Sequence, residues 1–165
     1  MRLISSILFS TAAVTIVGAL GCSSPNLGVP PQVCSTQAVN AGESELMEPG
    51  GACIDCHTSY EGPGFTIAGT VMSAPHDDTN CAGVANVTVA ITGADGMRVE
   101  LISNSNGNFK LDRWPGTKLF PYTAEVSRDG VVGKMLTPRE QGQSDCNACH
   151  TSTGTNAAPG RIVAP

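Results

Sequence analysis

The sequence predicts a mainly β protein, a small antiparallel β-sandwich with a short loop segment at each end. Across residues 65–136, apolar residues recur at every second position in short runs, the pattern of strands that bury one face. Three dipeptides between these runs predict hairpins, because glycine adopts a positive φ without steric cost: Asp95-Gly96, Asn106-Gly107 and Asp129-Gly130. On each side of this region lies one copy of the motif Cys-x-x-Cys-His. About six short strands in succession favour a sandwich.

The chain begins with a predicted signal peptide, residues 1–21. Arg2 supplies a positive charge, a largely apolar run follows, and small residues precede Cys22. Ala19-Leu20-Gly21-Cys22 resembles a bacterial lipobox, in which the cysteine becomes the lipidated first residue of the mature protein. A non-lipid signal peptidase would cut the same bond. We expect export to the cell envelope with a lipid anchor on Cys22. Because no aspartate follows that cysteine, we expect delivery to the outer membrane.

The number of cysteines agrees with lipidation. The chain has seven cysteines, four of them in the two motifs, which leaves Cys22, Cys34 and Cys81. If Cys22 carries lipid, Cys34 and Cys81 form an even pair that an exported protein can oxidise. Without lipid one thiol is left over. The sequence therefore predicts a disulfide between Cys34 and Cys81.

Composition narrows the classes of partner. Acidic residues number 14 against 9 basic ones, for a net charge of −5. This balance argues against nucleic acid as a partner and against membrane attachment through a polybasic patch. Residues 22–46 are rich in Ser, Pro, Gly, Asn and Gln without a sustained period, so they are predicted to be a flexible tether.

The two cysteine motifs predict covalent haem. They lie in a first segment, residues 47–64, and in a second segment with the tail, residues 137–165. Two thiols at this spacing add to the vinyl groups of a porphyrin as thioethers, and the histidine that follows becomes the proximal iron ligand. We expect two covalently attached haem c groups, the first on Cys53 and Cys56 with His57, the second on Cys146 and Cys149 with His150. Each flanking segment is thus a predicted haem-binding loop.

Two other uses of such cysteine pairs fit this sequence less well than haem does. Paired Cys-x-x-Cys knuckles hold structural zinc, and a single pair acts in thioredoxin-like redox chemistry. Zinc knuckles are rarely so far apart in sequence with a histidine directly after each. A redox pair would lie in a βαβ unit, which neither copy shows. The export signal also favours haem.

The second axial ligands are predicted by counting. A low-spin electron carrier needs two axial ligands on each iron, usually histidine or methionine. Of three histidines, only His76 remains after the proximal pair, and it lies in a polar loop with carboxylates close by. His76 is the predicted distal ligand of one haem, without assignment to either. The other iron takes Met135, with Met47 as the next candidate, or stays open. Met97 is expected in the core.

The strand region resembles the carboxypeptidase regulatory-like (transthyretin-like) sandwich. The likeness covers residues 65–136 and is carried by Ala68-Gly69-Thr70-Val71, Gly83-Val84-Ala85-Asn86-Val87-Thr88-Val89 and Ser105-Asn106-Gly107-Asn108-Phe109-Lys110-Leu111. It implies a scaffold without an active site of its own. With a haem segment at each end, the whole arrangement resembles the small two-haem c-type lipoproteins of bacterial envelopes.

This resemblance and the motifs together predict an exported cytochrome that relays single electrons between redox partner proteins. Two alternatives remain open. One is a small peroxidase-like haem enzyme with an open iron, which needs a distal acid–base group. The other is a redox-sensing surface scaffold. An oligomer or polymer is expected if both irons have two histidine ligands, because a neighbouring chain must then donate one.

Overall fold

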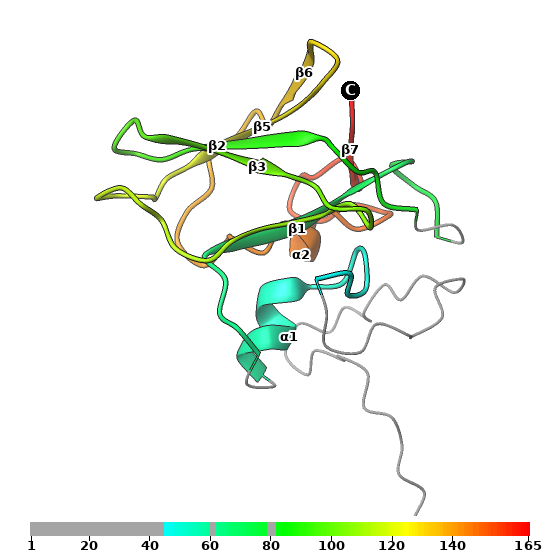
Figure 1. Cartoon of the computed structure of the whole chain (residues 1–165), viewed down its shortest axis with the longest axis horizontal. Coiled ribbons are helices and arrows are strands. Elements are labelled where there is room, and N and C mark those ends of the chain that lie inside the picture. The colour runs from blue at the N-terminus through cyan, green and yellow to red at the C-terminus, as the bar shows by residue number, and fades with distance from the viewer. Residues whose placement is uncertain (1–44, 60–61, 79–81) are drawn as a thin grey trace, which may run out of the picture.

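The computed structural model describes residues 45–59, 62–78 and 82–165, and it has two sheets packed as a small sandwich (Figure 1). The predicted mainly β class is confirmed. The signal peptide, Cys22, Cys34, Cys81 and most of the predicted tether lie outside the described residues, so the predictions made for them stay predictions. No helix in the described ranges is long and apolar enough to cross a membrane.

Seven strands and two short helices make up the described fold. In chain order they are α1 Cys53–Ser59, β1 Ile67–Met72, β2 Thr88–Thr92, β3 Arg98–Ile102, β4 Asn108–Leu111, β5 Thr123–Arg128, β6 Val131–Lys134, α2 Cys146–Cys149 and β7 Ile162–Val163. One sheet has the order β4-β1-β7 and the other β3-β2-β5-β6. All paired strands are antiparallel except β1 and β7, which are parallel.

Two of the three predicted turns join neighbouring strands of one sheet. Gly96 has φ +78° between β2 and β3, while Asp129 and Gly130 have φ +50° and +84° between β5 and β6. The third predicted hairpin, at Asn106-Gly107, does not form. Asn106-Gly107 carries the chain from β3 in one sheet to β4 in the other, so it is no hairpin within a sheet. Gly107 is needed there because a Cβ would lie 2.7 Å from the Cα of Gly83.

The core lies between the two sheets. Its buried members are Ile67, Val71, Val87, Val89, Ile91, Phe109, Leu119 and Tyr122. Strand β1 departs from the expected alternation, because all six of its residues are buried. One face of β1 contributes to this core, and α1 and α2 cover the other (Figure 1). At Gly69 a Cβ would lie 2.7 Å from Phe109 and 2.8 Å from the Cβ of Cys146, so a glycine lets the second motif approach.

Met97 was expected in the core, and the structure corrects this. Its side chain is 41% exposed. Met97 precedes β3 and belongs to the hairpin turn, where its backbone amide donates to Oδ1 of Asp95 and its carbonyl accepts from Gly93. Met97 continues the sequence alternation of Val99 and Leu101, but β3 begins only at Arg98, so the alternation does not place Met97 in the core.

The chain enters the fold along the turn before β4. Three asparagine side chains, two residues apart in sequence, donate their amides to three successive backbone carbonyls. Asn104 donates to the carbonyl of Glu45 at 2.6 Å, Asn106 to that of Leu46 at 2.7 Å, and Asn108 to that of Met47 at 2.5 Å. These bonds hold the last residues of the predicted tether and set the path into α1.

Candidate haem-attachment sites

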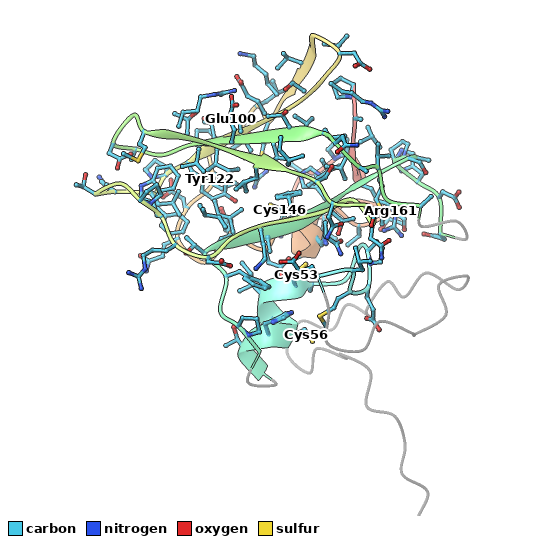
Figure 2. The ribbon with its side chains drawn as sticks, in the orientation of Figure 1. Cys53, Cys56, Glu100, Tyr122, Cys146 and Arg161 are labelled. Atoms are coloured by element: carbon cyan, nitrogen blue, oxygen red, sulfur yellow. The ribbon has the colours of Figure 1, made fainter. Side chains whose placement is uncertain are left out.

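The two cysteine motifs form short helices on the same face of β1, although loops were expected there. In α1 the amide of Cys56 donates to the carbonyl of Ala52 at 3.1 Å, and after α2 the amide of His150 donates to the carbonyl of Cys146 at 2.9 Å. Such local backbone bonds turn the spaced cysteines through one helical turn. Figure 2 shows Cys53 at the end of α1 nearest to the sheet and Cys56 farther from it.

The start of the first motif meets the start of the second. Asp145, the residue before Cys146, accepts hydrogen bonds through Oδ2 from the amide of Ile54 at 2.8 Å and from that of Asp55 at 3.3 Å. Burial raises the pKa of Asp145 above its usual range, and these amide bonds oppose the rise. Segments about ninety residues apart in sequence therefore share one half-buried carboxylate.

Three of the four motif cysteines are free thiols: Cys53, Cys146 and Cys149. Burial raises the pKa of Cys53 and of Cys146 to about 12, and the Asp145 carboxylate adds to both rises. Both therefore stay protonated at neutral pH. The side-chain amide of Asn156 donates to Sγ of Cys149 at 3.5 Å.

Cys56 is in a different state, because it is disulfide-bonded. A sulfur in a disulfide cannot at the same time form a thioether with a porphyrin. The predicted attachment at Cys56 therefore requires this disulfide to be reduced first.

His150 has the arrangement of an iron ligand. Its Nδ1 lies 2.8 Å from the carbonyl oxygen of Gly160. A carbonyl only accepts, so Nδ1 carries the hydrogen and Nε2 keeps a free lone pair. Burial lowers the pKa of His150, which favours the neutral ring. A second hydrogen bond of this kind commonly orients a ligating histidine.

His57 lies in a different setting. Its Nδ1 is buried and has no hydrogen-bond partner among the described residues. The ring packs against Phe65, with the ring centroids 4.6 Å apart and the planes at 50°. Gly62 closes the other approach, because a Cβ there would collide with Nδ1 of His57. The two predicted proximal histidines are thus held by different means, one by a hydrogen bond and one by packing.

The spare histidine lies beside the second motif. Nδ1 of His76 is 2.7 Å from the carbonyl oxygen of Ser152, two residues after His150. The ring also borders Gly160, where a Cβ would lie 2.9 Å from its Cε1. The Ser152 bond requires a hydrogen on Nδ1, so Nε2 of this exposed ring is free to bind a metal.

The methionine candidates are less clearly placed. Met135 is half-buried and packs on the core that Cys146 also borders. Met47 is half-buried, and its carbonyl is held by Asn108. Met72, which sequence reasoning passed over, is buried, and its Cε lies 2.8 Å from where a Cβ of Gly50 would be. Met72 lies two residues after Thr70 on β1 and so shares the face that the motifs cover, which the sequence pattern does not reveal.

Sequence reasoning also missed Asp145, Asn147 and Gly160. Asp145 could have been singled out, because an aspartate directly before a helical motif is a typical helix cap. Nothing in the sequence marks the carbonyl of Gly160 as a histidine partner.

Among the described residues no three His, Cys, Asp or Glu side chains gather in a way that could hold a metal ion. Comparison with known proteins finds no matching family model, no matching curated protein and no matching solved structure. The resemblances to transthyretin-like sandwiches and to two-haem lipoproteins therefore depend on the residues that carry them.

Proposed function

We propose that this protein is an exported two-haem c-type cytochrome that relays single electrons in the bacterial cell envelope. The observation that carries the proposal is the pair of complete Cys-x-x-Cys-His motifs, each helical and each against β1. Haem iron supplies reversible one-electron chemistry when bound. The chain sets its burial, its axial ligands and the spacing of the two sites.

The second motif has the side chains that a haem needs, without a prior chemical step. Both of its thiols are free. His150 keeps Nε2 available because Nδ1 is bound to Gly160, and His76 has the same free atom beside it. These residues would hold the group through two thioethers and two imidazoles, or through one imidazole if His76 stays away from the iron.

The first motif fits after one preparatory step. Cys53 is a free thiol, while the disulfide at Cys56 has to be cleaved before a second thioether forms. A dithiol reductant supplies the two electrons and two protons, so that Cys56 and its partner become thiols and the reductant becomes a disulfide. His57 then supplies the proximal imidazole, whose buried Nδ1 lacks a partner in the described part of the chain.

Mass and optical spectra of the mature protein, made with the haem-attachment machinery, test the proposal. We expect two covalent porphyrins and reversible one-electron reduction of both. Two low-spin haems support the carrier. One high-spin haem that turns over peroxide supports the peroxidase-like alternative, in which His76 acts as distal base. Protein with bound zinc, or without porphyrin, would overturn the proposal.

The lipid anchor is a further part of the proposal, and it predicts the location of the protein. Cys22→Ser should release the protein from the membrane fraction into the soluble envelope fraction, because one acylated cysteine provides the attachment. Ser24→Ala, two residues away, should leave the fractionation unchanged. If Cys22→Ser stays with the outer membrane, lipid on this residue is not the anchor.

A further inference from the structure

Helix α1 has its N-terminal cap supplied by the second motif. The residue just before α1 is Ala52, whose side chain has no acceptor for the free amides of the first turn. Oδ2 of Asp145 accepts from two of these amides, those of Ile54 and Asp55. Asp145 stands at the N-cap position of its own helix α2, yet its side chain makes no cap hydrogen bond there. The hydrogen bonds of its carboxylate thus go to the other motif, while the nearby amides of Asn147 and Ala148 in its own helix also act on it electrostatically.

Asn147, a spacer residue inside the second motif, makes a second set of contacts to the same region. It is buried, with 4% of its surface exposed. Its Nδ2 donates to the carbonyl of Gly51 at 2.8 Å and to the hydroxyl of Thr70 at 3.0 Å, and its Oδ1 accepts from the amide of Thr70 at 3.0 Å. Nδ2 also lies 3.7 Å from Sγ of Cys53. The approach to α1 is thereby tied to β1 through the second motif.

We propose that Asp145 and Asn147 are positioning residues for the first haem site, so that Cys53, Cys56 and His57 reach their attachment geometry only when the second motif is folded beside them. The inference rests on the proposed function for its haem readout, but the cap itself can be tested without haem. It implies that the two sites load dependently: a change before Cys146 weakens attachment at a motif far away in sequence.

Hydrogen exchange on the full mature chain, made without attachment machinery, tests the cap. In Asp145→Ala the amides of Ile54 and Asp55 should exchange about fivefold to thirtyfold faster, the range expected when a helix loses its N-cap. Asp145→Asn keeps an oxygen acceptor of the same reach and should retain most of the protection. Serine is a favourable N-cap residue for α2 but is too short to reach α1, so Asp145→Ser should behave as the alanine variant does.

Glu140→Ala is the matched control, because it removes an exposed carboxylate from the same segment. It should leave the exchange of α1 unchanged. Equal exchange of the Ile54 amide in wild type and Asp145→Ala would overturn the inference. A uniform increase that also includes β2 and β5 would overturn it too, since it would mean general destabilisation. If Asp145→Ala does not fold, the comparison of Asp145→Ser with Asp145→Asn decides.

Haem loading supplies the second readout. In protein made with attachment machinery, Asp145→Ala should lower the share of molecules with porphyrin on the first motif, as located by peptide mass mapping, while the second motif stays loaded. Asp145→Asn and Glu140→Ala should load both. Loss from the second motif alone would contradict the inference. Wild type without porphyrin would end the proposed function, while the exchange experiment would still decide whether Asp145 caps α1.

Discussion

Cys149→Ala should reduce the mature protein from two covalent porphyrins to one. Cys149 is a free thiol at the end of α2 and is one of two sulfurs predicted to attach the second haem. With only Cys146 left in that motif, covalent attachment there should be lost, while the first motif keeps both of its cysteines. Intact mass after acid–acetone extraction, which removes haem that is not covalently bound, measures the change directly.

The control for this experiment is Asn156→Gly. Asn156 donates to Sγ of Cys149 and has φ +49°, a conformation that glycine adopts freely. This variant removes the contact and keeps the thiol, so it should retain two porphyrins. Two covalent porphyrins on Cys149→Ala would contradict the assignment of Cys149. A loss confined to the first motif would contradict it as well.

His76→Ala should convert the second haem to high spin and leave the first nearly unchanged. His76 is the single histidine left after the two proximal ligands, and its ring lies beside Ser152 and Gly160, next to the second motif. Losing a distal imidazole leaves one axial position to water or nothing, which changes the optical spectrum of that haem. The spectral change should be absent in a Cys149→Ala background, where the second haem is lost.

This prediction also implies mixed ligation in the wild type. The first haem then has His57 with a methionine, Met135 or Met47, or stays open, so the two haems should titrate at distinct potentials. Met135→Ala should remove any methionine–iron charge-transfer band. Asp78→Asn, two residues along the His76 loop, should leave both haems low-spin. If His76→Ala leaves both haems low-spin and unshifted, the ligand assignment is wrong. Two bis-histidine haems in the wild type would instead require a ligand from a neighbouring molecule.

The sequence by itself determined the features that depend on residues close together in the chain. Period-two runs predicted six of the seven strands that the described residues form. Asp129-Gly130 predicted a tight hairpin, because its backbone needs positive φ at both residues. The haem prediction likewise uses five consecutive residues, Cys53 to His57, and their repeat at Cys146 to His150.

The tertiary structure decided what depends on residues far apart. Alternation cannot tell that β1 is covered on both faces, since the second cover comes from α1 and α2. The turn dipeptide Asn106-Gly107 cannot predict that β4 joins the other sheet, because such a dipeptide sets local backbone angles and does not select the partner strand. The spare imidazole of His76 acquired its place beside the second motif only when β1 and the tail paired.

The same reason explains the cap of α1. Ala52 before the first motif predicts an uncapped helix, and Asp145 before the second predicts a cap for its own helix. Folding adds a partner that the local sequence does not predict, because packing on β1 brings Oδ2 of Asp145 within 2.8 Å of the Ile54 amide. The motifs and strands could thus be predicted from the sequence, while the dependence of one motif on the other arises from contacts that only the packed chain forms.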